Sequence, residues 1–309
     1  MTIILFLFAK FFSICLTELE LRISPRFSSF CKNGLFPDEL GRSVREGGAC
    51  QVKRIPGRDG LIAKEIKIQK NDVDKIAMII REINNMNCLL ENKAVGFVHL
   101  ENCYFAKTST DIIVQMIMPE MKFGTLADVL RKIKDSPLET NWIIHTMYVL
   151  ASSLESIQKA GVIHRDIKPE NIMFADKEFM NPLFIDFGFS LMGTESRDTL
   201  GTPGFTAPEI MAILDLNPKA LPKSHSRKFP SKYTSKVDVF SLGVTFLMLW
   251  NKGNGLQVAR DGSYKPLEHN TNIPEKIEKL IMGMIEFDPN ERMTIKNVEK
   301  VLREMVELF

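Results

Sequence analysis

The 309-residue sequence predicts an α+β protein in which a small strand-rich part precedes a larger helical part. Between residues 35 and 118, apolar stretches are short and are broken by glycine and proline, which is typical of strands joined by turns. After Thr125, apolar residues recur with a helical period over several long segments. The composition is that of a globular protein, with 45% hydrophobic and 25% charged residues.

The strand-rich part contains a predicted hairpin, one helix and a further strand. The turn signal Pro56-Gly57-Arg58-Asp59-Gly60 predicts that residues 49–55 pair with residues 61–68. Residues 72–90 carry apolar side chains at helical spacing, and residues 112–118 form an apolar strand. Helices are predicted over residues 126–133, 142–159, 237–250, 274–286 and 295–308, and the polar, basic residues 218–232 are expected to be an inserted loop.

We expect residues 1–34 to be an extension and residues 35–309 to be one domain, with lobes at about 35–121 and 122–309. The extension begins with an apolar run, residues 1–16, which is shorter than a membrane-spanning helix and contains Lys10. No basic segment precedes this run, as it would in a signal peptide. A cytoplasmic location is therefore expected, and membrane contact through residues 1–16 is the alternative.

Charge and cysteine content exclude several classes of function. The formal net charge of +2 gives no indication of a nucleic-acid partner. The five cysteines are odd in number and include no Cys-x-x-Cys pair, which argues against a disulfide framework or a zinc site. Reduced thiols are expected, as in the cytosol.

The strongest chemical signal is the segment His164-Arg165-Asp166-Ile167-Lys168-Pro169-Glu170-Asn171. It combines an acidic residue, a lysine two positions on and an asparagine five positions on. Asp186-Phe187-Gly188 follows after an apolar stretch, and Ala207-Pro208-Glu209 ends the loop beyond it. Asp166 can act as a general base, and the oxygens of Asn171 and Asp186 suit Mg²⁺.

This ordered set of motifs resembles the eukaryotic-type serine/threonine protein kinase family, from about Leu35 to the C-terminus. The resemblance implies a two-lobed, protein-kinase-like fold with a strand-rich N-lobe and a helical C-lobe. It also implies Mg²⁺-assisted transfer of the γ-phosphate of ATP to serine or threonine hydroxyls of protein substrates. Lys168 would offset charge on the γ-phosphate, and Thr202 matches the threonine that bonds to the catalytic aspartate and lysine in serine/threonine kinases.

The resemblance also assigns residues that would contact ATP. Residues 62–66 resemble the strand that carries the ATP-contacting lysine, and Lys64 is favoured over Lys67. The reason is that Glu82 lies eighteen residues beyond Lys64, a separation typical of the paired lysine and helix glutamate. Residues 118–121 match the hinge, where the Pro119 carbonyl and the Met121 amide would bind the adenine edge.

The glycine-rich loop departs from the family pattern. If Val52 takes the place of the valine in that pattern, Gly47 is the middle glycine, while Cys50 replaces the third glycine and Arg45 the first. Side chains at these places obstruct the approach of backbone N–H groups to phosphates. The alternative function is therefore a pseudokinase or scaffold that uses the fold without efficient catalysis.

Three further matches concern support and regulation. Asp238 resembles the aspartate that braces the catalytic loop, with Phe240 where tryptophan is usual, and Arg292 resembles the arginine that pairs with Glu209. In the family, an arginine at the place of Arg165 often needs a negative charge in the following loop. We hypothesise that Asp198 supplies part of that charge. Phosphorylation by an upstream activating kinase is the alternative, at Thr199, Ser196 or Thr194.

Overall fold

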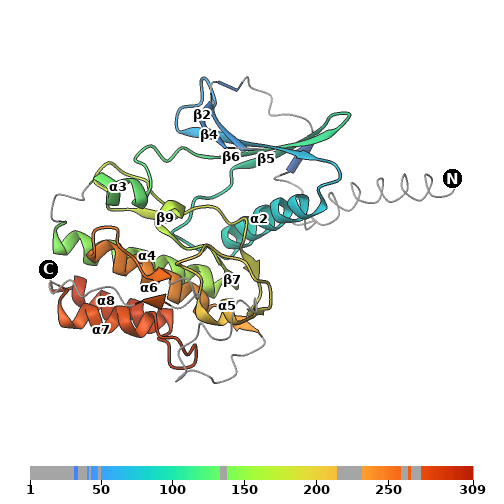
Figure 1. Ribbon diagram of the computed structural model, residues 1–309. Helices are drawn as coiled ribbons and strands as arrows, with labels where there is room; N and C mark the ends of the chain where they lie inside the picture. The colour runs from blue at the N-terminus through green and yellow to red at the C-terminus, as the bar shows by residue number, and fades with distance from the viewer. Residues whose placement is uncertain are drawn as a thin grey trace. The chain divides into compact units, whose positions relative to one another are not determined.

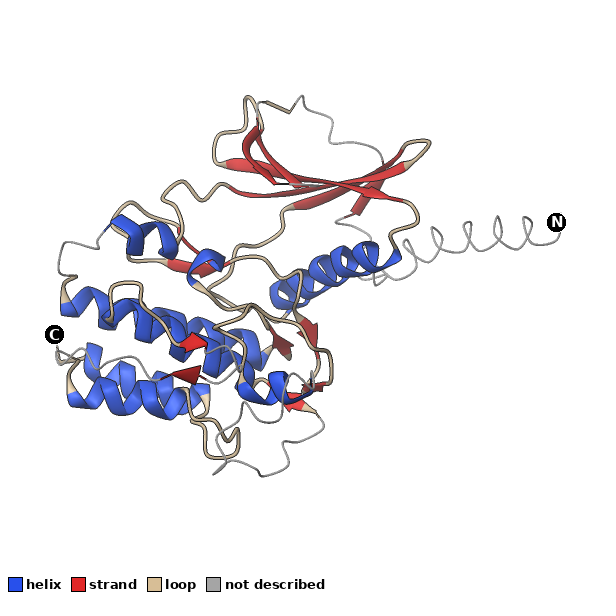
Figure 2. Ribbon diagram, in the orientation of Figure 1, coloured by secondary structure: helices blue, strands red, loops and turns tan. Residues whose placement is uncertain are grey.

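A computed structural model describes residues 31–33, 40–41, 43–47, 50–132, 138–213, 232–258, 264–265 and 273–308. The chain divides into two compact units. Unit 1 holds the described residues up to Leu90 together with His99–Glu120, and unit 2 holds Glu91–Val98 and the residues from Met121 onward. Strands predominate in unit 1 and helices in unit 2, as the sequence predicted (Figure 2). The sequence had placed residues 91–98 with the first lobe, whereas they belong to unit 2.

Unit 1 is built on a six-stranded sheet with the order β1-β5-β6-β4-β3-β2 (Figure 1). Its neighbouring strands are antiparallel except β1 and β5, which are parallel. The strands are β1 (Cys31–Asn33), β2 (Ser43–Gly47), β3 (Cys50–Arg54), β4 (Leu61–Gln69), β5 (Asn102–Lys107) and β6 (Asp111–Pro119). Strand β1 was not predicted, because it lies inside the expected extension.

The predicted hairpin is confirmed as β3 and β4, in which Cys50 lies opposite Ile66 and Arg54 opposite Ile62. Its turn uses Gly57 and Gly60 at φ angles of 76° and 85°, values that glycine adopts without a steric penalty. In this unit, a small core cluster of Ile55, Ala63, Tyr104 and Ile117 packs against Leu40 and Leu61.

Helix α2 (Val73–Glu91) lies in unit 1 except for its last residue, and it confirms the predicted helix over residues 72–90. Asp72 precedes it and accepts a hydrogen bond from the backbone N–H of Lys75 at 3.1 Å, which satisfies a free donor of the first turn. The apolar face that the sequence predicted is buried at Ile79, Ile80 and Ile83. Glu82 is buried on the same helix, so an acidic side chain lies among apolar ones.

Unit 2 is a helical layer in which α4 lies beside α6 and α8, and α7 beside α6 and α8 (Figure 1). Helix α6 is buried at every residue from Val237 to Phe246, and it forms the centre of the unit. The helices are α3 (Leu126–Lys132), α4 (Thr140–Lys159), α5 (Pro208–Ile213), α6 (Lys236–Trp250), α7 (Glu275–Met284) and α8 (Ile295–Val306). Each predicted helix is therefore present, and its ends differ from the predicted ends by at most two residues. Helix α7 ends before the predicted Glu286 because Ile285 already caps it.

Unit 2 also contains short strand pairs, and β7 and β9 of these pairs lead into loops that carry the motifs. The pairs are β7 (Val162–Ile163) with β10 (Leu191–Met192), β8 (Ile172–Phe174) with β9 (Pro182–Phe184), β11 (Glu195–Ser196) with β12 (Tyr233–Thr234), and β13 (Gln257–Val258) with β14 (Tyr264–Lys265). Residues 164–171 follow β7, and Asp186 follows β9. Two- and three-residue strands leave no periodic pattern in a sequence, so they were not predicted.

Several predicted features lie outside the described residues. They are the apolar run at residues 1–16, Ala49 at the start of the predicted hairpin, and residues 218–231 of the predicted insertion. Within the part of the chain that the structure describes, no helix combines the length and apolar character needed to cross a membrane.

Candidate active site

Asp166 lies at the centre of a hydrogen-bonded cluster in the loop between β7 and the 3₁₀ helix Pro169–Asn171. Its Oδ1 accepts a hydrogen bond from Thr202 Oγ1 at 2.5 Å. Its Oδ2 accepts from Lys168 Nζ and from Asn171 Nδ2, both at 2.8 Å. The structure thus brings together the four residues that the sequence nominated for catalysis.

The directions of these hydrogen bonds are fixed by the chemistry of the groups. Lys168 can only donate, and its Nζ lies 2.7 Å from Thr202 Oγ1 as well as beside Asp166. The threonine oxygen therefore accepts from Lys168, and its own hydrogen is directed at Asp166. An ionised carboxylate, which only accepts, is the form of Asp166 that satisfies all three donors.

Asn171 and Asp186 present oxygen atoms suited to a magnesium ion. Asn171 Nδ2 donates to the backbone oxygen of Asp166 at 2.9 Å and to its carboxylate, so both amide hydrogens are used. The side-chain oxygen of Asn171 consequently points away from Asp166. The backbone N–H of Ile185 donates to the backbone oxygen of Asn171 at 3.0 Å. Because the exposed Asp186 directly follows Ile185, this bond places it near Asn171. A carboxylate and an amide carbonyl are hard ligands of the kind that Mg²⁺ prefers.

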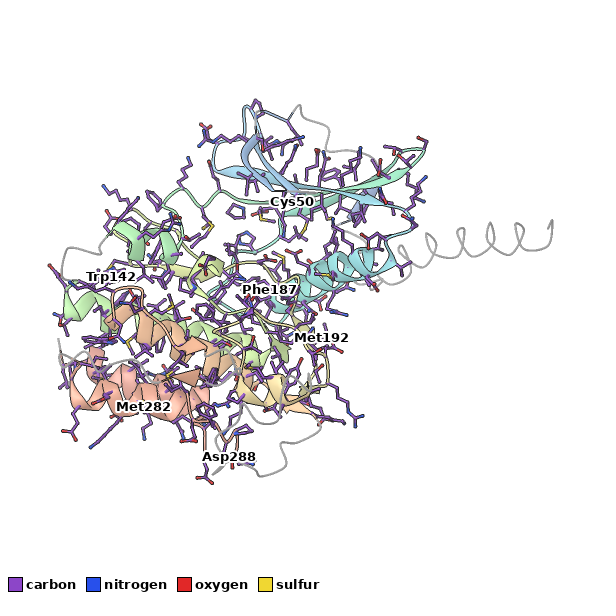
Figure 3. The ribbon with its side chains drawn as sticks, viewed as in Figure 1. Cys50, Trp142, Phe187, Met192, Met282 and Asp288 are labelled. Atoms are coloured by element: carbon purple, nitrogen blue, oxygen red, sulfur yellow. The ribbon has the colours of Figure 1, made fainter. Side chains whose placement is uncertain are left out.

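Asp186 projects from a strained turn beside a buried aromatic stack. Its φ angle is 63°, a left-handed value that is uncommon for a residue other than glycine. The next residue, Phe187, is fully buried (Figure 3) and lies 4.8 Å from the His164 ring and 5.8 Å from the Phe97 ring, between centroids. Burial of Phe187 therefore fixes the turn that leaves the Asp186 carboxylate exposed.

Asp238 braces the loop that precedes Asp166, as the sequence predicted. Its carboxylate accepts hydrogen bonds from two consecutive backbone N–H groups, those of His164 at 2.7 Å and Arg165 at 2.8 Å. Asp238 lies in the first turn of α6 and is fully buried. Burial raises the pKa of the Asp238 carboxyl, while the neighbouring His164 and Arg165 act in the opposite direction. The buried helix thus holds the loop that contains Asp166 by the backbone of that loop.

Arg165 connects this loop to the segment that follows Asp186. Its guanidinium Nη1 lies 3.0 Å from Asp198 Oδ2, so the structure brings together the two residues that the sequence paired. The same Nη1 donates to Tyr233 Oη at 3.0 Å. Sequence reasoning missed Tyr233, whose only local signal is its place five residues before Asp238, at the entry to α6.

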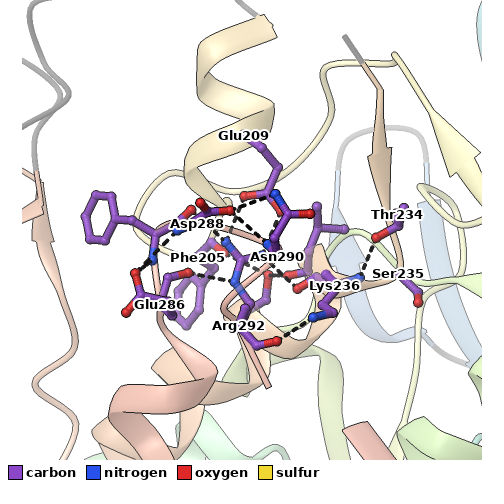
Figure 4. Close-up of polar contacts among 12 residues, drawn as sticks. Phe205, Glu209, Thr234, Ser235, Lys236, Glu286, Asp288, Asn290 and Arg292 are labelled. Carbon is purple, nitrogen blue, oxygen red and sulfur yellow. Dashed lines mark hydrogen bonds and ion pairs between the residues drawn. The ribbon is translucent and has the colours of Figure 1, made fainter. Parts of the chain in front are cut away.

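Glu209 and Arg292 form the buried ion pair that the sequence predicted (Figure 4). Arg292 Nη1 and Nη2 donate to the two carboxylate oxygens of Glu209 at 2.7 and 2.9 Å. The guanidinium carbon lies 5.1 Å from the centre of the Phe240 ring. Lys236 Nζ donates to the backbone oxygen of Arg292. Burial, and then the charge of Arg292, lower the pKa of Lys236.

In unit 1, the structure distinguishes the two lysines that the sequence offered. Lys64 Nζ lies 2.7 Å from Glu82 Oε1, and both side chains are largely buried. Lys67 instead lies 3.3 Å from Asp111, with 65% of its side chain exposed. Val52 lies directly opposite Lys64 on the neighbouring strand. The lysine–glutamate pair proposed from the spacing is therefore formed by Lys64.

The remaining nominated residues lie at the ends of strands. Gly47 ends β2 opposite Cys50, and residues 48 and 49 between them are not among the described residues. Pro119 ends β6 opposite Leu61, and the next N–H, that of Glu120, donates to Gly60 O at 2.8 Å. Met121 is half-buried and is the first residue of the second segment of unit 2, which follows Glu120. The nucleotide contacts assigned to these residues stay predictions.

Comparisons with known proteins agree with this geometry. A family model described as "Protein kinase domain" matches residues 40–302. The chain is 26% identical over 255 residues to serine/threonine-protein kinase unc-51 of Caenorhabditis elegans, covering 76% of this chain and 26% of that protein. It is 28% identical over 260 residues to calcium-dependent protein kinase 11 of Oryza sativa subsp. japonica, an alignment that covers 79% of this chain and 40% of that protein. It is also 25% identical over 272 residues to the liver/testis isoform of the phosphorylase b kinase gamma catalytic chain of Bos taurus. That alignment covers 83% of this chain and 63% of the relative.

The matched regions are larger fractions of this chain than of its relatives. The alignments span between 26% and 63% of the length of the three relatives above. The similarity therefore concerns the domain that contains the cluster around Asp166, and the relatives carry further sequence beyond it.

Proposed function

Because this chain belongs to the protein kinase domain family, and its relatives named above are protein kinases, we propose that it transfers the γ-phosphate of ATP to serine or threonine hydroxyls of protein substrates. The observation that carries the proposal is the cluster of Lys168, Asn171 and Thr202 around the Asp166 carboxylate. The strand-rich unit 1 and the helical unit 2 agree with the two-lobed fold of the family.

In the proposed reaction, Asp166 acts on the substrate hydroxyl. Its carboxylate accepts a hydrogen bond from the hydroxyl and takes the proton as the new oxygen–phosphorus bond forms. At the same time the bond between the γ-phosphorus and the bridging oxygen of ADP breaks, and ADP leaves with the electron pair. Lys168, which lies 2.8 Å from Asp166, offsets the negative charge of the transferred group. The base and the cation are thus held next to one another before substrate binds.

Asn171 and Asp186 are the proposed magnesium ligands. Both amide hydrogens of Asn171 are bound to Asp166, which leaves its carbonyl oxygen to face a metal ion. The metal ion would neutralise phosphate charge when it is bound with ATP. In unit 1, Lys64 would contact the phosphates, and its pairing with Glu82 holds the ammonium in place.

The adenine and phosphate contacts complete the proposal. The Pro119 carbonyl would accept from the adenine edge, and the Met121 N–H would donate to it. Gly47 lies in the predicted phosphate-covering loop, and Val52 lies on the strand that leaves it, opposite Lys64. Lys168 and Thr202 support serine and threonine as acceptors, since their bonds to Asp166 are those expected for this class of kinase.

One assay separates the enzyme from its alternative, a pseudokinase or scaffold. The purified protein is incubated with γ-labelled ATP, Mg²⁺ and myelin basic protein, in parallel with Asp166→Asn. We expect label on serine or threonine of the acceptor, and at least about 100-fold less with Asp166→Asn. Transfer no greater than that of Asp166→Asn would falsify the enzyme, and nucleotide binding retained in that case would favour the pseudokinase.

Cys50 is the residue that favours the alternative function, a pseudokinase or scaffold. It occupies a place where the family pattern has glycine, at the start of β3 and opposite Gly47. A side chain at this place hinders the approach of backbone N–H groups to phosphates. Comparing the KM for ATP of the wild type and Cys50→Gly measures this hindrance directly, and a lower KM in Cys50→Gly is the expected result.

A further inference from the structure

We propose that Cys31 and Cys103 form a disulfide when the protein meets a mild oxidant such as hydrogen peroxide, and that this bond locks strand β1 onto the sheet of unit 1. The inference goes beyond the proposed phosphotransfer, because neither cysteine is among the residues proposed to take part in that reaction. It gives a chemical role to a strand that lies inside the extension expected from the sequence.

Strand β1 stands at one end of the strand order in the six-stranded sheet, next to β5. It has three residues, and its pairing with β5 is parallel, whereas the other neighbouring strands of this sheet are antiparallel. Parallel pairing is slightly less stable per residue, and three residues form few hydrogen bonds. The backbone contacts of β1 are therefore weak, so a covalent bond would change how firmly the strand is attached.

The register of the two strands places two cysteines directly opposite one another. Cys31 is the partner of Cys103, and the pairs that follow are Lys32 with Tyr104 and Asn33 with Phe105. Successive residues of a strand face opposite sides of a sheet, so a shift of one residue would put the two cysteines on different faces. The observed register is thus one that allows a bond between them.

The spacing of paired strands also suits a disulfide. Neighbouring strands lie about 4.8 Å apart. The Cα atoms of two disulfide-bonded cysteines are usually roughly 4.4 to 6.8 Å apart. Cysteines that are direct partners on paired strands, as Cys31 and Cys103 are, can therefore be joined with little movement of the backbone.

The reaction needs only the two thiols and one peroxide. Cys103 is fully buried, so we expect the oxidation to begin at Cys31, on the outermost strand. The Cys31 sulfur attacks one oxygen of hydrogen peroxide and the O–O bond breaks, which leaves a sulfenic acid and one water. The Cys103 sulfur then attacks the Cys31 sulfur, and the hydroxyl group leaves with the proton of the Cys103 thiol as a second water. Two thiols are oxidised to one disulfide, and the peroxide is reduced to two molecules of water.

A bond that forms only on oxidation agrees with the reduced thiols expected from the cysteine content. Disulfides that form in a reducing compartment are usually transient and often serve as redox sensors. The bond between Cys31 and Cys103 would close a loop that contains β2, β3, β4 and α2, and with them the Lys64–Glu82 pair. Closing a long loop restricts the unfolded chain, so the oxidised form should hold unit 1 together more firmly than the reduced form.

Peptide mapping tests the bond directly, because trypsin cleavage after lysine and arginine places the five cysteines in five different peptides. The full chain is treated with hydrogen peroxide under native conditions, the remaining thiols are alkylated, and the protein is digested without reductant. We expect peptide 27–32 to be joined to peptide 94–107, with a yield at least about 10-fold above that of any other pair of cysteines. A reductant added to the digest should separate the two peptides.

Two variants and one condition show whether the bond depends on the register. Cys31→Ser should abolish the link to peptide 94–107. Combining Cys31→Ser with Lys32→Cys moves the thiol by one residue, to the position opposite Tyr104, and should give at least about 10-fold less link to Cys103 than the wild type. In concentrated urea, where the strands are separated, the wild type should lose its preference for the pair of Cys31 and Cys103.

Hydrogen–deuterium exchange measures whether the bond locks β1 in place. Residues 102–107 should exchange more slowly in the oxidised than in the reduced wild type, while peroxide should leave their exchange unchanged in Cys31→Ser. Absence of the link after native oxidation overturns the inference, and so does a link that is equally abundant in the double variant or in concentrated urea. Unchanged exchange in the linked protein overturns the locking role. These results do not depend on phosphotransfer, so a failure of the proposed kinase activity leaves them standing.

Discussion

Arg292 and Glu209 are joined by two parallel hydrogen bonds, with 0% and 1% of their side chains exposed to solvent. Arg292 also donates Nε to the backbone oxygen of Glu286 at 2.8 Å and Nη1 to that of Lys236 at 2.9 Å. The arginine therefore ties the start of α5, the start of α6 and the end of α7 together. Burial makes the pair sensitive to the loss of either partner, because the remaining charge cannot be hydrated.

We predict that Glu209→Gln lowers the free energy of unfolding by about 3 to 5 kcal/mol. The glutamine keeps the shape of the side chain but leaves the Arg292 guanidinium without a counter-charge. Urea unfolding followed by tryptophan fluorescence measures the effect in unit 2, where Trp142 and Trp250 both lie.

Glu275→Gln is the matched control for this prediction. It removes the same charge from an i,i+4 pair with Lys279 in which both side chains are more than 70% exposed. Exposed pairs of this kind contribute less than about 1 kcal/mol. Equal losses in the two variants would contradict the role given to burial of the Glu209–Arg292 pair.

Local patterns in the sequence were enough to predict most of the fold. The helical spacing of Ile79, Ile80 and Ile83 indicated α2, and the Pro56–Gly60 turn signal indicated the β3–β4 hairpin. These features are encoded by neighbouring residues, so a single sequence contains them. The cluster around Asp166 was predictable in the same way, because Lys168 and Asn171 lie within five residues of it.

Features that depend on contacts between distant residues were not predictable. Residues 91–98 belong to unit 2 because Gly96 O accepts from Phe184 N, and Phe184 O accepts from Val98 N. No periodicity or motif in this short segment indicates those bonds. Tyr233 was missed for the same reason, since its partners Arg165 and Asp198 are 68 and 35 residues away. Glu209 and Arg292 lie 83 residues apart. Their pairing was predicted from the resemblance to a known family, because no local pattern in the sequence indicates it.

Lys64 and Lys67 allow a direct test of the ATP-contacting residue. We predict that Lys64→Met lowers kcat/KM by at least about 100-fold, because it removes the cation that Glu82 holds in place. Lys67→Met removes an equal charge from the same strand, but from an exposed pair with Asp111, and should change kcat/KM by less than about threefold. Steady-state kinetics with varied ATP measures both. A greater loss in Lys67→Met would reverse the assignment.

Asp128 predicts a pH dependence of stability. Its carboxylate accepts from the backbone N–H of Thr125 at 2.8 Å, while Thr125 Oγ1 accepts from Asp128 N at 3.1 Å, which is a capping box at the start of α3. The backbone hydrogen bond is the main cause that lowers the pKa of Asp128 below its ordinary 3.8, and burial acts against it. A carboxyl group whose pKa is lowered on folding stabilises the protein above its unfolded-state pKa. That contribution is lost as the pH falls through the folded-state pKa.

The difference in free energy of unfolding between the wild type and Asp128→Asn should therefore be larger at about pH 6 than at about pH 3. Urea unfolding at the two pH values measures it. Arg131→Gln removes only an exposed partner of Asp128 and should retain most of the pH dependence. A difference between the wild type and Asp128→Asn that stays constant from one pH to the other would show that the capping carboxylate contributes nothing through its charge.

Thr202 provides the sharpest test of the catalytic cluster, because a single hydroxyl group joins Lys168 to Asp166. Thr202→Val keeps the shape of the side chain but removes this hydroxyl, so that Asp166 Oδ1 loses its donor and Lys168 loses an acceptor. We predict a fall in kcat of roughly 10- to 100-fold in Thr202→Val, through misplacement of the base. Thr202→Ser restores the hydroxyl and should stay within about threefold of the wild type, since its oxygen can make the same two bonds. Single-turnover phosphotransfer with saturating ATP compares the variants at the chemical step. Equal rates for Thr202→Val and Thr202→Ser would show that the Thr202 hydroxyl has no part in the proposed reaction.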